Sequence, residues 1–243
     1  MKGLVCAGGE ATRLGELTRV TNKHLLPIGD RPMVQWSVDF LRDAGVRDLL
    51  LVTGADHVDD FRGYFGDELD FAIQQEAGGI AEALGLARDF AAGDRIVVML
   101  ADNFFSGPIS DTVHNFEAQD RGARVLLAPV RELEHLRHLG VPRIEEGRIT
   151  EIVEKPQDPP SGLAVTGVYC YESSVFDIIQ TLEPSGRGEL EITDVNNHYI
   201  REGTLEYDIV EGFWGDAGES IDVYYAVNDF VRANGANLTP VAD

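Results

Sequence analysis

The sequence predicts an α/β fold: a Rossmann-like, mostly parallel mixed sheet flanked by helices. Short β-type runs alternate with helical patterns through the first half of the chain, the order that places parallel strands side by side. The expected strands of this half are largely apolar, which indicates that both faces of the sheet are covered. A hydrophobic content of 44% is sufficient for a sizeable core.

The strands are expected where short apolar runs are bounded by glycine or polar residues. The first run, GLVCA, is followed by a glycine-punctuated loop that extends to about residue 31. The run IVVMLA ends on Asp102, at the carboxyl end where open α/β sheets place their ligands. The expected strands lie at 3–7, 49–53, 71–75, 96–101, 125–130, 149–153, 163–171 and 205–210.

The first helix is marked by apolar residues that recur at helical spacing from Met33 to Ala44. Pro32 suits its first helical position, and Gly45 suits the residue after its end. Segment 156–162 (PQDPPSG) is expected to be a surface loop, so one domain spans residues 1–243. The other helices are expected near 56–64, 80–90, 175–182, 193–202 and 221–231.

Charge and cysteine content narrow the classes of function. The chain carries 42 acidic and 20 basic residues, a formal net charge of −22, which disfavours binding to nucleic acid or to anionic lipid. The apolar stretch at the start of the sequence is too short for a signal peptide. No apolar run approaches the ~18 residues that are needed to span a bilayer. Cys6 and Cys170 lie in apolar runs, which predicts buried thiols. We expect a cytoplasmic protein, and the acidic excess is compatible with a salt-rich cytoplasm.

The loop after the first strand reads AGGEATRL, from Ala7 to Leu14. Its consecutive glycines, Gly8 and Gly9, allow backbone N–H groups to turn toward an anion, and Arg13 supplies a charged fork for phosphate. The loop matches neither G-x-G-x-x-G nor G-x-x-x-x-G-K-[ST], so neither a dinucleotide site nor a Walker loop is supported. Taken alone, it is equally compatible with an ordinary glycine-rich turn.

This loop is one of eight motifs that together span nearly the whole chain. They read AGGEATRL (7–14), NKHLLP (22–27), QEAGGIA (75–81), LADN (100–103), EKP (154–156), VTGVY (165–169), RGELEITD (187–194) and WGDAG (214–218). In this order they resemble the motifs of the sugar nucleotidyltransferase family, in particular the short form of the glucose-1-phosphate thymidylyltransferases, which lacks a C-terminal helical extension. The run RGELEITD is the most specific of them.

The resemblance implies the fold of the nucleotide-diphospho-sugar transferases and a defined reaction. A sugar 1-phosphate oxygen attacks the α-phosphate of a nucleoside triphosphate, and pyrophosphate leaves. The implied substrates are dTTP and glucose 1-phosphate, the product is dTDP-glucose, and the cofactor is Mg²⁺. Such a transfer needs two anionic substrates held in line and cations that neutralise their repulsion. The nucleotide-binding part is expected over about 1–130 and the sugar-binding part over about 131–243.

The resemblance assigns two cations to the triphosphate. Arg13 is expected at the leaving pyrophosphate and Lys23 at the α-phosphate, beside the phosphate loop formed by Gly8 and Gly9. The chain contains only three lysines, and two of them, Lys23 and Lys155, fall in matched motifs. A solvated loop lysine is the alternative interpretation of Lys23.

Metal binding and base recognition are assigned in the same way. Asp102 and Asp216 are the implied Mg²⁺ ligands, in keeping with the one or two carboxylates that this ion usually takes. Asp102 is also counted with the nucleotide site. Gln75, with Gly79, resembles the pair that binds the base, since an amide can both donate to and accept from a pyrimidine edge. The adjacent Gln74 is the residue most easily confused with Gln75.

The sugar phosphate is assigned to the second half of the chain. Lys155 and Arg187 resemble the cations that hold its phosphate, and Lys155 is counted as catalytic with Arg13 and Lys23. Glu154 resembles the residue that accepts hydrogen bonds from the sugar hydroxyls. Gly140 and Gly167 are expected where the family surrounds the hexose.

The sequence departs from the family pattern at four places. Glu10 and Ala11 stand where x-Gly is usual in the phosphate loop, and Ala101 replaces the glycine before Asp102. The run HLGVP at 138–142 lacks the usual aromatic residue, and Ala217 stands where a hydroxyl is usual. These changes bear on sugar identity and turnover more than on the class of reaction.

Two alternatives remain open at this point. Within the family, the enzyme could use UTP or another sugar phosphate. In a different class, the chain could be a nucleotide-binding regulatory subunit without turnover, which the retained set of cations and carboxylates argues against. The resemblance also implies a homo-oligomer, either a dimer or a tetramer.

Overall fold

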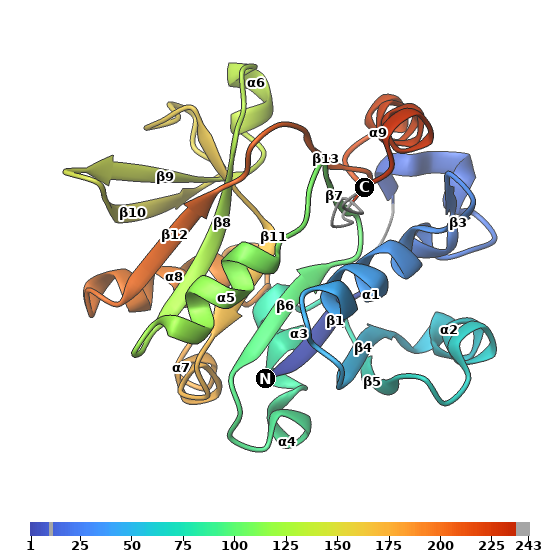
Figure 1. The fold of residues 1–243 in the computed structure, drawn as a ribbon, viewed down its shortest axis with the longest axis horizontal. Coiled ribbons are helices and arrows are strands. Elements are labelled where there is room, and N and C mark those ends of the chain that lie inside the picture. The colour runs from blue at the N-terminus through green and yellow to red at the C-terminus, as the bar shows by residue number, and fades with distance from the viewer. Residues whose placement is uncertain (10–11, 237–243) are drawn as a thin grey trace, which may run out of the picture.

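The computed structural model describes residues 1–9 and 12–236. Its centre is a seven-stranded sheet in the order β12-β8-β11-β6-β1-β4-β5 (Figure 1). Neighbouring strands run parallel, except that β11 is antiparallel to both β6 and β8, so the predicted mixed, mostly parallel sheet is confirmed. The strands are β1 (Lys2–Cys6), β4 (Leu49–Gly54), β5 (Asp70–Gln74), β6 (Ile96–Leu100), β8 (Ala123–Pro129), β11 (Leu163–Tyr171) and β12 (Leu205–Ile209).

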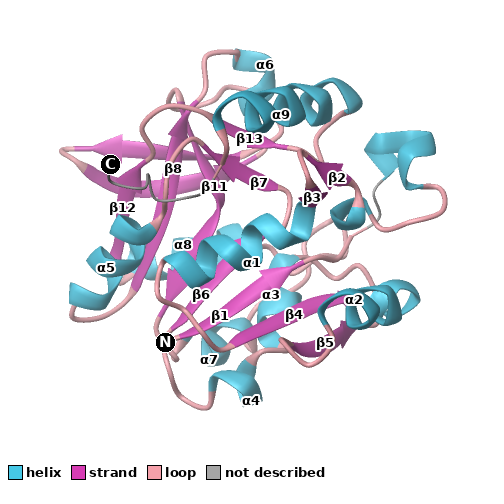
Figure 2. Cartoon of the chain, turned by 45° about the vertical axis from the view of Figure 1, so that its right-hand side comes forward, coloured by secondary structure: helices cyan, strands magenta, loops and turns pink. Residues whose placement is uncertain are grey.

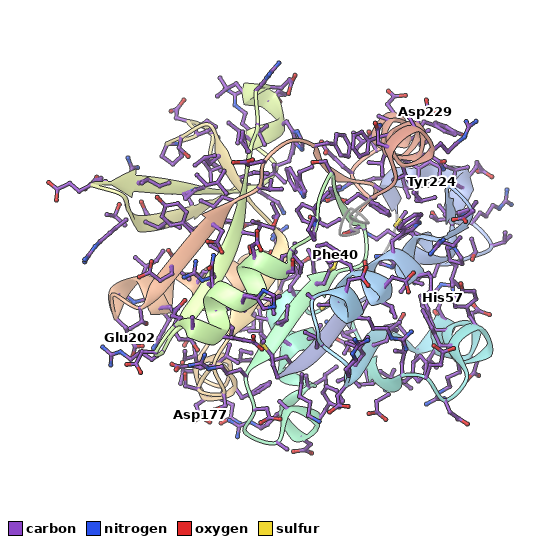
Figure 3. All side chains as sticks on the ribbon, in the orientation of Figure 1. Phe40, His57, Asp177, Glu202, Tyr224 and Asp229 are labelled. Carbon is purple, nitrogen blue, oxygen red and sulfur yellow. The ribbon has the colours of Figure 1, made fainter. Side chains whose placement is uncertain are left out.

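Helices cover both faces of this sheet (Figure 2). Successive residues of β1 point to opposite faces, so Leu4 and Cys6 belong to one buried apolar cluster and Val5 belongs to another. Phe40 extends from a helix into the second cluster, where it stacks on Phe105 at a ring-centroid distance of 5.8 Å (Figure 3). The first face is covered by α3 (Ile80–Gly85), α7 (Val175–Ile179) and α8 (Ile192–Arg201), and the second by α1 (Met33–Asp43), α2 (Val58–Phe65) and α5 (Ser110–Ala118).

A short antiparallel pair joins two distant parts of the chain. Strand β7 (Asn103–Phe105) follows β6, and β13 (Trp214–Asp216) pairs with it so that Asp216 lies opposite Asn103. The pairing therefore places Asp216 beside the end of β6. The remaining elements are β2 (Pro27–Ile28), β3 (Arg31–Pro32), β9 (Gly140–Glu145), β10 (Arg148–Glu154), α4 (Arg88–Ala91), α6 (Leu133–Leu136), α9 (Ile221–Asn234) and the 3-10 segments η1 (Thr12–Thr18), η2 (Lys23–Leu25) and η3 (Ala55–His57).

The strands expected from the sequence are all present, and one expected helix is wrong. The helix predicted over 80–90 is two helices, because α3 ends at Gly85 and α4 begins only at Arg88. Helix α1 begins at Met33, one residue after Pro32, and Gly45 follows its end with a φ of +87°. The sequence patterns did not reveal α5, α6, β7, β9 or β13.

Two further expectations can be compared with the structure. Cys6 and Cys170 are buried free thiols, as predicted, and burial raises the pKa of Cys6 to about 12. Within residues 1–9 and 12–236, no helix has both the length and the apolar character needed to cross a bilayer.

Candidate active site

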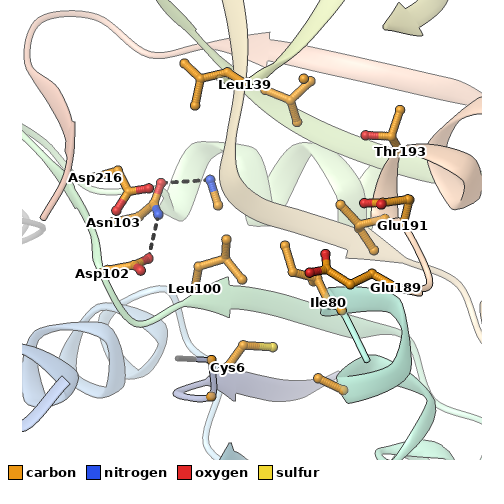
Figure 4. Close-up of a pocket in the computed structure, with 18 of the residues that line it drawn as sticks. Cys6, Ile80, Leu100, Asp102, Asn103, Leu139, Glu189, Glu191, Thr193 and Asp216 are labelled. Carbon is orange, nitrogen blue, oxygen red and sulfur yellow. Dashed lines mark hydrogen bonds between the residues drawn. The ribbon is translucent and has the colours of Figure 1, made fainter. Parts of the chain in front are cut away.

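A cavity of about 480 Å³ opens at the carboxyl ends of β1, β5 and β6. Figure 4 shows Asp102, Asn103 and Asp216 on one side of it, and Glu189 and Glu191 on the other. This is the edge of the sheet where α/β folds of this type place their ligands.

The glycine loop after β1 forms part of the wall. Gly8 and Gly9 both line the cavity, and Gly9 has a φ of +95°, a backbone conformation that favours glycine. Arg13 also lines the cavity, and its side chain is exposed. Glu10 and Ala11, where the sequence departs from the family pattern, lie outside the described residues.

Lys23 and two carboxylates converge on one buried point. Lys23 Nζ lies 2.5 Å from Asp102 Oδ2, and the side chain of Asp102 is 9% exposed. A Cβ on Gly218 would lie 2.6 Å from Lys23 Nζ, 2.8 Å from Asp102 Oδ2 and 3.2 Å from Asp216 Oδ1. The three charged groups therefore surround the α-carbon of Gly218, and a side chain at that position would fill the space between them.

Burial and charge repulsion set the ionisation of this group. Burial raises the pKa of Asp216 to about 7, and the nearby carboxylate of Asp102 adds to the rise. Burial also disfavours the ionised form of Asp102, but Lys23 and His24 outweigh that effect and lower its pKa. Burial opposes the charge on Lys23 as well, and the two carboxylates overcome it and raise its pKa. Near neutral pH, Lys23 and Asp102 thus form an ion pair beside a partly protonated Asp216.

The two carboxylates have the donor chemistry of a magnesium site. They direct hard oxygens toward the same space, and Mg²⁺ commonly binds one or two protein carboxylates and completes its shell with water and phosphate oxygens. Among the residues that the structure describes, no three His, Cys, Asp or Glu side chains are arranged as a self-sufficient metal site. Asp102 and Asp216 therefore fit Mg²⁺ that also binds a phosphorylated substrate.

Asn103 holds Asp102 in place through a hydrogen-bond network (Figure 4). Its Nδ2 donates to Asp102 Oδ1 at 3.0 Å, and its Oδ1 accepts from the backbone N–H of Gly167 and from Trp214 Nε1, both at 2.8 Å. A Cβ on Gly167 would lie 2.6 Å from Asn103 Nδ2, so β11 can approach this closely only with glycine there. The backbone N–H of Ala217 also donates to the carbonyl of Asp102, at 2.8 Å.

Two further cations lie among carboxylates on the opposite wall. Arg187 Nη2 donates to Glu191 Oε1 at 2.9 Å, and Lys155 Nζ lies 3.7 Å from Glu154 Oε1. Glu154 Oε2 accepts a hydrogen bond from the Thr193 hydroxyl at 2.6 Å. Lys155 has a φ of +45°, which is uncommon for a residue with a Cβ and is often found at functional sites.

The glycines expected at the site differ in how tightly they are packed. Gly79 has a φ of +92°, and a Cβ there would lie 2.5 Å from the carbonyl oxygen of Leu190, so the position requires glycine. A Cβ on Gly140 would make ordinary contacts, 3.4 Å from Ile152 and 3.6 Å from Glu154. Both glycines line the cavity.

Gln74 lines the cavity, whereas Gln75 does not. Gln74 is the last residue of β5 and is 8% exposed. Gln75 is exposed and lines an adjoining cavity of about 600 Å³. The structure therefore places Gln74, and not the expected Gln75, in this cavity, since β5 ends at Gln74 and Gln75 follows the strand.

The other expected site residues are brought together, and several cavity residues had been given no role. Asn103, Thr193 and Trp214 lie in the motifs LADN, RGELEITD and WGDAG, and their place in those motifs was the signal that could have identified them. The expected residues that line the cavity are Gly8, Gly9, Arg13, Lys23, Gly79, Asp102, Gly140, Glu154, Lys155, Gly167, Arg187 and Asp216.

The departures from the family pattern divide into two kinds. Ala101 and Ala217 are fully buried, and neither is among the residues that line the cavity. His138 and Leu139 do line the cavity, so its wall carries these two side chains where the family usually has an aromatic residue.

Comparisons with known proteins identify the family. The chain matches the nucleotidyl transferase family over residues 2–234. It is 34% identical over 234 residues to the low-salt glycan biosynthesis nucleotidyltransferase Agl11 of Haloferax volcanii. The match covers 93% of this chain but 65% of that protein, so the chain spans just under two thirds of its length. It is 37% identical over 238 residues to the glucose-1-phosphate thymidylyltransferase of Neisseria meningitidis, covering 94% of this chain and 82% of that one.

A solved structure shares the fold across nearly the whole chain. A candidate glucose-1-phosphate thymidylyltransferase from Bacillus anthracis, crystallised with sucrose, superimposes with a TM-score of 0.90 and 44% identity. The match covers 96% of this chain and 95% of that one. On its sequence, its fold and the residues of its cavity, this chain belongs to the nucleotidyl transferase family.

Proposed function

We propose that the protein is a glucose-1-phosphate thymidylyltransferase, which makes dTDP-glucose and pyrophosphate from dTTP and glucose 1-phosphate. One observation carries the proposal. Arg13, Lys23, Lys155 and Arg187 line a single cavity, which they share with five carboxylates. Four cations to five carboxylates is a much higher proportion than the 20 basic to 42 acidic residues of the whole chain. Such a concentration of cations in an acidic protein favours strongly anionic ligands.

The positions of the cations suit two phosphorylated substrates. Arg13 and Lys23, on the side of the glycine loop, are assigned to the pyrophosphate and the α-phosphate, and Lys155 and Arg187 to the phosphate of glucose 1-phosphate. A phosphate oxygen of the sugar phosphate forms a bond to the α-phosphorus. The bond from that phosphorus to the bridging oxygen breaks, and pyrophosphate leaves with the electron pair. The four cations reduce the repulsion between the substrates and hold them in line.

Asp102 and Asp216 are assigned to Mg²⁺. When bound, the ion would neutralise charge that develops on the phosphate oxygens. Asn103 holds Asp102 Oδ1, which leaves Oδ2, the oxygen nearest Lys23, directed to the shared space. Lys23 is therefore placed to contact both the carboxylate and a phosphate oxygen of the substrate.

Specificity is assigned to the remaining polar groups of the cavity. Gln74, in place of the expected Gln75, is assigned to the base together with Gly79. Glu154, held by Thr193, is assigned to the sugar hydroxyls, with Gly140 giving the ring room to approach.

Three wider expectations belong to the same proposal. They are a homo-oligomer (dimer or tetramer), a cytoplasmic location and a division into a nucleotide-binding part over about 1–130 and a sugar-binding part over about 131–243. The location is supported by the buried free thiols Cys6 and Cys170. The metal site would join the two parts, since Asp102 belongs to one and Asp216 to the other.

A pyrophosphate-release assay tests the proposal. Four nucleoside triphosphates (dTTP, UTP, dCTP and ATP) are combined with glucose, galactose and mannose 1-phosphates in the presence of Mg²⁺. We expect dTTP with glucose 1-phosphate to give the highest kcat/KM, and Lys155→Met to lose at least ~100-fold, since each 1.36 kcal/mol is about tenfold. Lys2→Met is the matched control, because Lys2 pairs with Asp48 and does not line the cavity.

Other outcomes would favour the alternatives. A higher kcat/KM with UTP, or with another sugar phosphate, would assign the protein to a different member of the family. Nucleotide binding without pyrophosphate release from any pair would indicate a regulatory subunit.

A further inference from the structure

Both N–H groups of the Gln74 amide are occupied within the protein. Nε2 donates to the carbonyl oxygen of Gly79 at 3.0 Å and to Glu82 Oε2 at 2.6 Å. A backbone carbonyl and a carboxylate are acceptors only, so the hydrogen-bond network fixes which end of the amide carries the nitrogen. Glu82 and the Gly79 carbonyl therefore together determine the orientation of a residue that lines the cavity.

The amide oxygen of Gln74 is the group left to meet a ligand. It lies 3.1 Å from the position that a Cβ on Gly8 would take, so it faces the glycine loop. Among the residues that the structure describes, no donor is bonded to this oxygen, although Gln74 is only 8% exposed. The oxygen is not one of the described polar atoms that are shut off from solvent without a partner, so it is open to the cavity, where a ligand can supply the donor.

Glu82 is itself held in a restricted place. It lies in the first turn of α3, and a side chain on Gly78 would collide with its carboxylate. The carbonyl of Gly78 accepts from the N–H of Leu190 at 2.8 Å, which fixes the turn that packs against Glu82. The carboxylate can thus act as a rigid acceptor for Gln74.

We propose that Glu82 locks the Gln74 amide so that only its oxygen faces the nucleotide, and that this selects the imide edge of uracil or thymine over cytosine. Uracil and thymine carry a hydrogen on N3, which donates to such an oxygen, whereas N3 of cytosine has none and is itself an acceptor. The inference rests on the proposed function, because it assumes that a pyrimidine nucleotide enters this cavity. Glu82 is a positioning residue, since it acts through Gln74.

The test compares dUTP with dCTP, which have the same size and opposite hydrogen-bond polarity. Dissociation constants are measured by calorimetry for the wild-type protein, for Glu82→Gln and for Glu76→Gln, a control that removes a charge from an exposed position outside the cavity. The wild type should bind dUTP at least tenfold more tightly than dCTP. Because the new amide at position 82 can also donate, only the Gly79 carbonyl still favours the present orientation of Gln74. The reversed amide should then become populated, and the ratio should fall at least fivefold in Glu82→Gln. Glu76→Gln should keep the wild-type ratio.

A second measurement uses only the wild-type protein, so the test stands even if Glu82→Gln does not fold. Methylation of dUTP at N3 removes the donor and should weaken binding at least tenfold. Equal binding of dUTP and its N3-methyl form, or a Glu82→Gln ratio within twofold of wild type, would overturn the inference while leaving the proposed function intact. Failure of the wild type to bind any pyrimidine triphosphate would overturn both.

Discussion

Lys23 Nζ lies 2.5 Å from Oδ2 of Asp102, with side chains that are 16% and 9% exposed. Asp216 lies beside this ion pair. Its pKa is raised whereas that of Asp102 is lowered, so Lys23 stabilises the ionised form of Asp216 less than that of Asp102. The two carboxylates are therefore not equivalent without metal. One is the partner of a buried cation, and the other repels its neighbour.

The two positions should respond oppositely to neutralisation. In Asp102→Asn, buried Lys23 loses its partner, which we expect to cost roughly 3 kcal/mol of unfolding free energy. In Asp216→Asn, a repelling charge is removed and Oδ1 can still accept from the N–H of Gly218, so stability should rise by about 1 kcal/mol at pH 8. Urea unfolding of both variants in EDTA measures the difference. Equal destabilisation by the two changes would contradict the inequivalence.

The raised pKa of Asp216 also predicts a pH dependence. The pKa is about 7 in the folded protein and near 3.8 in an unfolded chain, so between these values the folded state binds more protons than the unfolded state. The stability of the metal-free protein should then fall as pH rises from about 4 through 7. Asp216→Asn should lack this component, and the difference between the two unfolding profiles isolates it. Parallel profiles from pH 5 to 8 would show that Asp216 does not titrate in this range.

The sequence revealed the parts of the site that rest on one local pattern. Apolar runs identified the strands, and the ends of those strands placed Asp102 and the glycine loop at one edge of the sheet. The sequence did not reveal which of two adjacent residues at the end of a strand faces the cavity. Gln74 and Gln75 are adjacent and identical in type, and the strand ends between them, so only the exact end of β5 decides which of them faces the cavity.

Local sequence patterns also could not predict the elements that are stabilised by long-range contacts. Strand β13 has three residues, and it exists because it pairs with β7, more than a hundred residues earlier. Asn103 reads in the sequence as a polar residue after a strand. Its role appears only when β11 and β13 bring Gly167 and Trp214 within hydrogen-bond distance.

The two glutamines can be distinguished by substitution. Gln74→Ala removes the only amide of this pair that lines the cavity, and a buried base left without its partner should bind ~1–3 kcal/mol more weakly. Gln75→Ala is the matched control and should change the affinity for dTDP less than twofold. Calorimetric titration with dTDP gives both values. A larger loss in Gln75→Ala than in Gln74→Ala would return the assignment to Gln75.

The acidic surface predicts that salt stabilises the protein. With 42 acidic and 20 basic residues, self-repulsion should weaken as the Debye length shrinks from ~10 Å at 0.1 M to ~3 Å at 1 M. The melting temperature should therefore rise with KCl into the molar range. A flat or falling melting temperature in KCl would argue against salt adaptation and would leave the enzymatic proposal untouched.

The carboxylate pair gives the sharpest test of the proposed reaction. If Asp102 and Asp216 act through one ion, Asp102→Asn and Asp216→Asn should each lose at least ~100-fold in turnover, because metal-held charge in the transition state is worth several kcal/mol. Excess Mg²⁺ should partly rescue either variant if weakened metal affinity is the defect. The double variant should be little worse than the worse single variant, since the second change removes a ligand from an ion already lost. Measurements below the melting temperature of Asp102→Asn separate this effect from its lower stability. Losses that multiply independently, or full activity in Asp216→Asn, would show that the two carboxylates do not share an ion.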